Sequence, residues 1–163
     1  MAVNQTDPSR LGIDDVGEVL TLQRAAYVTE AQAYGDLAIP PLTQTLDELR
    51  AELADPQTTA WGIRERGRLV ASIRVRQTSP ATADIGRLAV APDRQGNGLG
   101  TALMLTAEAR LQDDVTVVRL FTGEHSHANL RLYQRLGYRE TGRSPAGSYN
   151  LVHLAKSRGA ARG

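Results

Sequence analysis

The chain has no cysteine and a single lysine, Lys156, among its 163 residues. The absence of cysteine excludes a disulfide framework, a thiolate metal site and a cysteinyl covalent intermediate. The formal net charge is +1 and the aromatic content is 4%, a balance that argues against a nucleic-acid-binding role. Any chemistry must therefore rest on other side chains and on the backbone.

Long apolar runs are also missing. No segment approaches the roughly 20 apolar residues that a membrane-spanning helix needs, and residues 1–30 carry no long apolar segment of the secretory kind. We therefore expect a cytoplasmic protein with no membrane partner. The chain is long enough for one domain with a sizeable core. We expect that domain over residues 1–156, followed by a disordered basic tail over residues 157–163.

Three glycines fall close together in the segment RLAVAPDRQGNGLGTALM, which covers residues 87–104. The apolar run before Pro92 predicts a buried strand that ends at the proline. Apolar residues from Leu99 onward recur at helical spacing, so the glycines lie at a helix N-terminus. Free amides and the positive end of the helix dipole make such a junction a binding site for an anion, typically a phosphate.

The spacing of these glycines distinguishes the segment from two common phosphate loops. It has no lysine for a P-loop, and Thr101 stands where a dinucleotide fingerprint has its third glycine. The pattern present, Gln95-x-x-Gly98-x-Gly100 after a short strand, resembles the acetyl-CoA signature of the GNAT acetyltransferase superfamily. The segment NLRLYQRLGY, residues 129–138, resembles the second signature of that family. The resemblance covers most of the chain.

The order of predicted elements agrees with that family. Hydrophobic periodicity predicts helices over residues 14–30, 45–54, 99–112 and 129–137, and strands over residues 58–66, 69–77, 83–91, 115–122, 138–143 and 149–155. The first dozen residues predict at most a weak strand, and Pro40 and Pro41 predict a connection that is not helical. We expect a single mixed α/β domain with a mostly antiparallel, twisted sheet and about four helices.

The resemblance implies that strands 83–91 and 115–122 splay apart and that acetyl-CoA binds in the gap. Its pantetheine arm would pair with the free edge of strand 83–91, and its pyrophosphate would meet the amides of the glycine segment. The residues expected to hold this cosubstrate are Leu88, Ala89, Val90, Arg94, Gln95, Gly96, Asn97, Gly98, Leu99, Gly100, Thr101, Asn129 and Tyr133. No metal is expected, because the single HxH segment of His125 and His127 is weak evidence for a metal site.

Acetyl transfer from a thioester to an amine needs a base, a donor for the oxyanion and an acid for the thiolate. By resemblance, Tyr133 is the general acid near the sulfur, and the Val90 amide is the oxyanion donor. Tyr133 also fits a role as a core residue that anchors its helix. Asp84 stands where some relatives carry a glutamate base, but it is one methylene shorter. Glu124 and the two histidines beside it are alternative bases.

The acceptor side is acidic, since residues 28–55 contain six carboxylates and one arginine. In the family this connection overhangs the acceptor site. Glu30, Tyr34 and Asp36, together with Glu124, are therefore expected to hold a cationic amine. With no cysteine and one lysine, we expect direct transfer from acetyl-CoA, although a serine or histidine intermediate stays open.

The expected activity is N-acetylation of a primary amine on a small molecule. A protein N-terminus or lysine is the alternative acceptor. A non-catalytic acyl-CoA-binding module is the alternative of a different class. Because relatives in the family often dimerise through their last strands, a homodimer is a further option.

Overall fold

Seven strands form one sheet in the computed structural model, which describes residues 7–159. The strand order is β1-β2-β3-β4-β5-β7-β6, and all neighbouring pairs are antiparallel except β4 and β5, which are parallel. The strands are β1 (Ser9–Leu11), β2 (Thr58–Glu65), β3 (Arg68–Ser79), β4 (Thr82–Val90), β5 (Val117–Gly123), β6 (Arg139–Ala146) and β7 (Tyr149–Ser157). The mixed α/β fold predicted from the sequence is confirmed.

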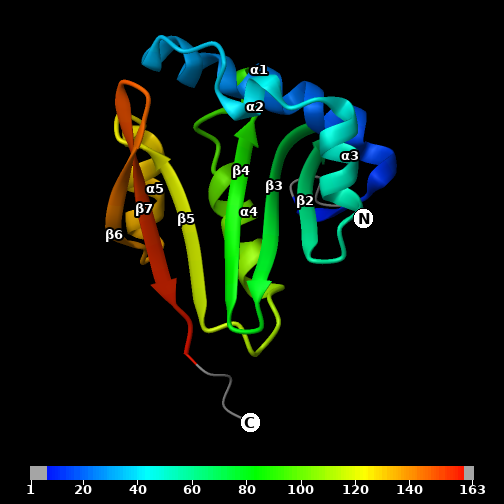
Figure 1. Cartoon of the computed structure of the whole chain (residues 1–163). Helices are drawn as coiled ribbons and strands as arrows, with labels where there is room; N and C mark the ends of the chain where they lie inside the picture. Colours follow the sequence, from blue (N-terminus) through cyan, green and yellow to red (C-terminus); the bar gives the residue numbers. More distant parts are fainter. Residues whose placement is uncertain (1–6, 160–163) are drawn as a thin grey trace.

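Helices pack against the sheet and cross its upper end. They are α1 (Val16–Tyr34), α2 (Pro40–Thr43), α3 (Leu46–Ala54), α4 (Leu99–Ala109) and α5 (His127–Arg135), with short 3-10 helices at Ile13–Asp15 and Pro92–Arg94. Helix α1 contacts β3 and β4, and α4 contacts β2, β3 and β4. In Figure 1, α4 lies behind the sheet and α1 and α2 run across the end toward which β4 points. The C-terminal end of β4 is therefore close to α1.

The connection after α1 differs from the sequence prediction. Pro40 and Pro41 open the short helix α2, where a non-helical segment was expected. Proline is tolerated in the first turn of a helix, because the amide hydrogen that it lacks has no partner there and its fixed φ suits the helix. The Gln44 amide then donates to the Pro40 carbonyl at 3.0 Å. The prolines thus start a turn of helix that bends the chain over the sheet.

The start of α3 agrees with the sequence prediction. The Thr45 hydroxyl accepts a hydrogen bond from the Glu48 amide at 3.1 Å, and the Glu48 carboxylate accepts one from the Thr45 amide at 3.0 Å. This reciprocal capping box satisfies two donors that the first turn leaves unpaired. Helix α3 therefore begins at a position set by local sequence.

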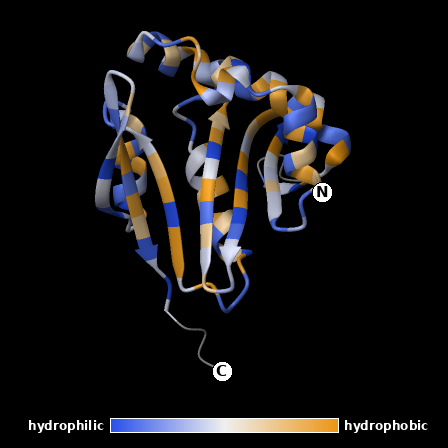
Figure 2. Ribbon diagram, in the orientation of Figure 1, coloured by the Kyte–Doolittle hydropathy of each residue, from blue (hydrophilic) through white to orange (hydrophobic). Residues whose placement is uncertain are grey.

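Strand β3 lies at the centre of the hydrophobic core. Its residues from Leu69 to Val75 form an unbroken buried run, because α1 and α4 both pack against this strand. Figure 2 shows hydrophobic and polar residues interspersed along β4, whereas β5 is mostly hydrophobic with a polar band. Arg74 is the one charged residue in the buried run of β3. A buried guanidinium needs partners, and it lies beneath the cavity described below.

The C-terminal strand extends slightly into the expected tail. Strand β7 ends at Ser157, and the Arg158 amide donates to the Thr116 carbonyl at 2.7 Å. The Arg158 guanidinium also donates to the Val115 carbonyl at 3.0 Å. Ser157 and Arg158 are therefore held by the fold, and residues 160–163 lie outside the described part of the chain. Over residues 7–159, no helix is both long enough and apolar enough to cross a membrane.

Candidate active site

Strands β4 and β5 separate after three residue pairs. Their parallel ladder joins only residues Thr82 to Asp84 of β4 to residues Val117 to Arg119 of β5. Farther along β4, its register with β3 shifts between Ser72 and Arg74, and opposite that shift Arg87 has a φ of +54°. A bulge of this kind bends its strand and increases the local twist. The splay expected from the family resemblance is therefore present, and Figure 1 shows the two strands diverging toward α1.

The edge of β4 that β5 leaves carries a free backbone donor. The Ala91 amide donates to the Val70 carbonyl of β3 at 2.8 Å. Because amides alternate from side to side along a strand, the Val90 amide points the other way, toward the splay. Nearby, the Leu88 carbonyl accepts a hydrogen bond from the Tyr27 hydroxyl at 3.0 Å. The position predicted for the oxyanion donor is thus at an unpaired strand edge.

The glycine loop between β4 and α4 depends on backbone conformation. Gly96 and Gly98 both have a φ of +78°, and a Cβ added to either would meet no atom within 4 Å. Glycine is therefore needed there for its left-handed backbone and not for close packing. Helix α4 starts directly after Gly98 with no side-chain cap, so its first amides are left for an external acceptor. The Asn97 side chain donates to the carbonyls of Arg94 and Gln95, both at 3.0 Å, and holds the loop in shape.

A cavity of about 510 Å³ lies over this loop, and we call it the glycine-loop cavity. Ten of the residues expected to hold acetyl-CoA line it, namely Leu88, Val90, Arg94, Gln95, Gly96, Gly98, Leu99, Gly100, Thr101 and Asn129. Ala89 is instead buried opposite Ser72 of β3, and Asn97 is turned back onto its own loop. Arg94 forms a bidentate ion pair with Glu65 at 2.5 and 2.7 Å, which compensates much of its charge.

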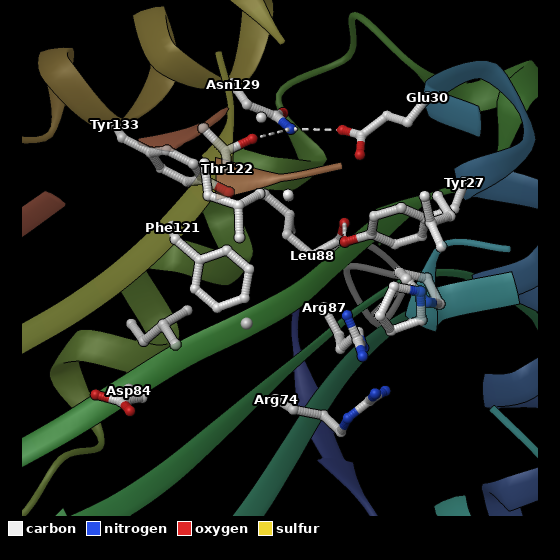
Figure 3. A pocket seen from close by; sticks show the side chains of 18 of the residues that line it. Tyr27, Glu30, Arg74, Asp84, Arg87, Leu88, Phe121, Thr122, Asn129 and Tyr133 are labelled. Atoms are coloured by element: carbon white, nitrogen blue, oxygen red, sulfur yellow. Dashed lines mark hydrogen bonds between the residues drawn. The ribbon is translucent and has the colours of Figure 1, made fainter. Parts of the chain in front are cut away.

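A second cavity of about 430 Å³ lies between the diverging strands, and we call it the splay cavity. Figure 3 shows its lining, with Tyr27 and Glu30 reaching in from α1 and Thr122, Asn129 and Tyr133 from β5 and α5. Five residues line both cavities, and we call them the junction residues: Tyr27, Glu30, Tyr34, Leu88 and Asn129. The two cavities are therefore adjacent and share these residues as a common wall.

Glu30 is the one carboxylate among the junction residues, and its pKa is raised. Its carboxylate accepts hydrogen bonds from the side-chain amide of Asn129 at 3.2 Å and from the Ser126 hydroxyl at 3.4 Å. Burial raises the pKa of Glu30 above that of an ordinary carboxyl group, although these two hydrogen bonds oppose the shift. A carboxylate with a raised pKa is a stronger base than one in water. The geometry thus allows Glu30 to take a proton as well as to bind a cation.

Tyr133 projects from α5 into the splay cavity. Its side chain is buried, and its ring meets that of Tyr138 edge-on with centroids 6.1 Å apart. No hydrogen bond to its hydroxyl forms within the described residues. Burial raises the pKa of Tyr133, and the nearby phenol of Tyr27 and carboxyl of Glu30 raise it further. The phenol therefore stays neutral at physiological pH and keeps a hydrogen to donate.

Tyr34 fastens α1 to the loop that precedes α5. Its hydroxyl lies 2.9 Å from the Ser126 hydroxyl and accepts a hydrogen bond from the His125 amide at 2.9 Å. Its ring packs on Tyr149 of β7 with centroids 4.2 Å apart. Gly123 allows this arrangement, because a Cβ there would overlap the Tyr34 hydroxyl. Tyr34 lines both cavities, but its contacts also hold α1 against β7 and against the loop that precedes α5.

Substituting Gly123→Ala should displace the Tyr34 side chain from its contacts. We expect the added methyl to lower the free energy of unfolding by about 1–3 kcal/mol, the usual cost of overpacking, as measured by urea unfolding. Gly142→Ala on β6 is the control, because a Cβ there meets no atom within 4 Å. Removing the Tyr34 phenol in the double variant Gly123→Ala/Tyr34→Ala should remove the clash. If the double variant were less stable than Tyr34→Ala alone, the overlap would not be the cause.

Three other residues expected at the site are engaged elsewhere. Asp84 lines the splay cavity, but Arg119 binds both of its carboxylate oxygens, at 2.8 and 3.2 Å. Glu124 accepts hydrogen bonds from the backbone and side chain of Asn150, and the backbone bond chiefly lowers its pKa. Asp36 accepts the Ala38 amide at 2.9 Å in the loop after α1. Glu124 and Asp36 line neither cavity.

The two histidines expected near the site, His125 and His127, line the glycine-loop cavity. Across residues 7–159, no three histidine, cysteine, aspartate or glutamate side chains gather in a metal-binding group. Sequence reasoning missed Tyr27 and Arg87. Tyr27 stands three residues before Glu30 and seven before Tyr34, a spacing that places all three on one helix face. That spacing was the signal for Tyr27.

The fold described above is that of an acetyltransferase family. The chain belongs to the acetyltransferase (GNAT) family, whose model matches residues 22–138. No curated protein matches the sequence of this chain. The fold is similar to that of the ribosomal-protein-S18-alanine N-acetyltransferase from Escherichia coli, with 20% identity, a TM-score of 0.75 and 92% of each chain covered.

Two further solved structures have the same fold. The PaiA N-acetyltransferase from Thermoplasma acidophilum in complex with coenzyme A is 16% identical, with a TM-score of 0.75 over 93% of this chain and 98% of that one. An aminoglycoside 6'-acetyltransferase type Ii is 20% identical, with a TM-score of 0.69 over 92% of this chain and 96% of that one. At these identities the likeness establishes the fold alone.

Proposed function

We propose that the protein transfers an acetyl group from acetyl-CoA directly to a primary amine of a small molecule. The observation that carries this proposal is the meeting of two cavities at the junction residues. One cavity has the glycine loop and a helix N-terminus, which suit a phosphate-bearing carrier. The other has a partly buried carboxylate and a buried phenol, which suit the proton transfers of aminolysis.

The glycine-loop cavity fits coenzyme A by its chemistry. The amides of residues 95–101 would face the pyrophosphate, and Thr101 would add its hydroxyl. The free edge of β4 at Val90 would receive the pantetheine arm as an added strand, with Asn129 on the opposite side. The thioester would then reach the junction. When bound, acetyl-CoA supplies an activated acyl group that reacts with an amine without a covalent enzyme intermediate.

Three groups of this chain would serve that reaction. Glu30 would accept the proton of the incoming ammonium, directly or through one water. The Val90 amide would donate a hydrogen bond to the carbonyl oxygen as negative charge develops there. Tyr133 would give its hydroxyl proton to the departing sulfur and regain one from the newly acylated, still cationic nitrogen, so that neither a buried thiolate nor a buried tyrosinate is left unpaired. Asp84 is a weaker candidate for the base, because Arg119 holds its carboxylate.

The volume of the splay cavity, about 430 Å³, and the residues that border it favour a small acceptor. Ile39, Pro40 and Pro41 at the start of α2 line part of it, and Ala146 and Tyr149 beside the turn between β6 and β7 line another part. These residues come from segments far apart in the chain and border the same space. A primary amine on a compact molecule fits such a space better than an extended peptide segment does.

The test is release of free thiol from acetyl-CoA with a panel of amines, with CoA affinity measured in parallel by calorimetry. Gly98→Val should weaken CoA binding by roughly 10–100-fold, the value of lost hydrogen bonds to a charged group, because valine resists the left-handed backbone. Gly67→Val is the matched control, since Gly67 has a φ of +82°, has open space around its Cα and lines neither cavity.

The possible outcomes separate the two classes of function. CoA binding with amine-dependent thiol release supports the enzyme. CoA binding without turnover of any amine would instead support an acyl-CoA-binding module. Equal CoA affinity in folded Gly98→Val and Gly67→Val variants would show that the glycine loop is not the binding site.

A further inference from the structure

Six charged side chains line the splay cavity: Glu30, Glu52, Asp84, Arg74, Arg76 and Arg87. Four of them are paired with opposite charge. Arg74 pairs with Glu52 at 2.8 Å, Arg76 pairs with Asp55 at 2.9 Å, and Asp84 pairs with Arg119 at 2.8 Å. Within residues 7–159, Glu30 and Arg87 have no such ion pair. The cavity therefore presents one uncompensated carboxylate and one uncompensated guanidinium.

The position of Arg87 is strained. It sits in the β4 bulge with a φ of +54°, a conformation that glycine adopts freely and other residues rarely do. Holding a non-glycine residue there costs on the order of 1–3 kcal/mol. No hydrogen bond from its guanidinium to the described residues offsets that cost. Within residues 7–159, the Arg87 guanidinium is therefore left available to a ligand in the splay cavity.

The surroundings of Arg87 favour a negatively charged ligand. Arg74 lies close by, fully committed to Glu52, Gln23 and Gln44 at 2.8, 2.9 and 3.3 Å. Burial chiefly lowers the pKa of Arg74, and the like charge of Arg87 lowers it further. Two guanidinium groups share this part of the cavity with one carboxylate. An anion bound at Arg87 would relieve their repulsion.

Tyr27 lies within the influence of both uncompensated charges. Burial chiefly raises the pKa of its phenol, the Glu30 charge raises it further, and the Arg87 charge lowers it. Figure 3 shows Tyr27 with Glu30 on one side and Arg87 on the other. A ligand that crosses the face of Tyr27 would therefore meet a carboxylate at one end and a guanidinium at the other.

We propose that Arg87 binds a carboxylate of the acceptor, so that the acceptor is an amino acid and not an uncharged amine or a polyamine. This inference rests on the proposed acetyltransferase function. The ammonium would face Glu30 at the junction, and the carboxylate would accept two parallel hydrogen bonds from the planar guanidinium of Arg87. The acidic residues of the segment 28–55 do not by themselves indicate a polyamine acceptor. Two of them, Glu52 and Asp55, are already paired with arginines.

The experiment compares matched acceptors. The L-amino acids are assayed against their α-amides, and ω-amino acids against n-alkylamines of the same chain length, by thiol release from acetyl-CoA. Spermidine is included as a polycation. We expect at least one amino acid to exceed its uncharged partner in kcat/KM by roughly 10–100-fold, the value of hydrogen bonds between charged groups.

Variants of Arg87 assign this preference to the side chain. In Arg87→Gln the acceptor KM should rise by roughly 10–100-fold, the preference for the carboxylate should disappear, and CoA affinity should not change. Arg87→Lys keeps the charge but cannot donate two parallel hydrogen bonds to one carboxylate, so it should retain part of the preference. Both replacements keep a Cβ in the left-handed backbone, so strain is matched. Arg139→Gln on exposed β6 removes a remote positive charge and should keep the full preference.

The outcomes separate this inference from the proposed function. Turnover of uncharged amines or spermidine at least as fast as amino acids would overturn the carboxylate site and leave the acetyltransferase intact. The same conclusion would follow if folded Arg87→Gln kept the preference of the parent protein. Loss of CoA binding, or failure of every amine in the panel, would instead count against the proposed function itself.

Discussion

Replacing Tyr133 with phenylalanine should lower kcat by roughly 10²–10⁴-fold, the contribution of a positioned general acid. The ring and its edge-on packing against Tyr138 are kept, and only the hydroxyl that faces the splay cavity is removed. Since that hydroxyl has no hydrogen bond within the described residues, the midpoint of thermal unfolding should hardly move. Steady-state kinetics and a thermal melt of the same preparation test both parts.

Tyr138→Phe is the matched control, because its hydroxyl has the opposite situation. It donates to the Glu108 carboxylate at 2.7 Å, and Glu108 is also paired with Lys156 at 2.9 Å. Loss of this hydrogen bond should cost about 1–3 kcal/mol of stability and leave kcat nearly unchanged. If Tyr133→Phe turned over within about threefold of the parent, well below a general acid's usual contribution, the tyrosine would be a core residue. Solvation of the thiolate would then have to take the place of the acid.

The fold was predictable because its signals are local. The capping box at Thr45, the helical stripes and the hairpin at Gly67 each depend on a few neighbouring residues, and all appear where expected. The helix at Pro40 was missed for a reason of the same kind. Two prolines exclude a helix interior but not a first turn, and sequence alone did not distinguish the two cases.

The conformation of the glycine loop was also predictable, whereas the carboxylate that is left without a cation was not. A strand, a loop of left-handed glycines and a helix N-terminus are contiguous in sequence, so the spacing of Gly96 and Gly98 was sufficient. Which carboxylate is free depends on partners far away in the chain. Arg119 lies on a different strand from Asp84, and Asn129 is remote from Glu30. Only the tertiary structure shows that Asp84 is paired and that Glu30 is partly buried, with no cationic partner among residues 7–159.

Arg87 shows the same limitation more sharply. Nothing in the segment around it predicts a left-handed residue, because the bulge arises from the register of β4 against β3. Its significance appears only after the ion pairs of Arg74 and Arg76 have been identified. The residues that set acceptor preference are thus defined by which charges the fold leaves unpaired.

Glu30→Gln should lower kcat/KM for the acceptor by roughly 10²–10⁴-fold near pH 7, the contribution of a general base. In the parent protein, kcat/KM should rise with pH through an apparent pKa above the ordinary carboxyl range, because burial raises the pKa of Glu30. The variant should lose that limb and keep only the limb set by the acceptor amine. Glutamine retains an oxygen for the hydrogen bonds from Asn129 and Ser126.

The pH limb must be assigned against the other ionisable groups around Glu30. These are the phenols of Tyr27, Tyr34, Tyr133 and Tyr149, the cavity groups Asp84 and Arg87, and the loop histidines His125 and His127. Burial raises the pKa of the Tyr27, Tyr133 and Tyr149 phenols, so these groups do not titrate in the range of the limb. A His125→Gln/His127→Gln variant is the control for the histidines and should keep the limb. Asp84→Asn, which also removes the partner of Arg119, should keep it too.

Glu30→Gln should also change the free energy of unfolding, in a direction set by the raised pKa of Glu30. A carboxyl whose pKa is higher in the folded state than in the unfolded state holds its proton more tightly when folded. Its contribution to stability is therefore present below the unfolded pKa and is lost as pH rises through the folded pKa. At pH 7 the parent carries this cost, so Glu30→Gln should have the larger free energy of unfolding.

The stability gain should disappear on acidification, because below the unfolded carboxyl pKa both states of the parent are protonated. Urea unfolding of the two proteins at pH 7 and near pH 4 measures the gap between them, which should shrink toward the lower pH. A variant that is slower and yet more stable at pH 7 is the signature of a buried base held at the cost of stability. If Glu30→Gln were less stable at pH 7, or if the gap did not depend on pH, Glu30 would be a structural hydrogen-bonding residue, and the proton of the ammonium would have to leave by another route.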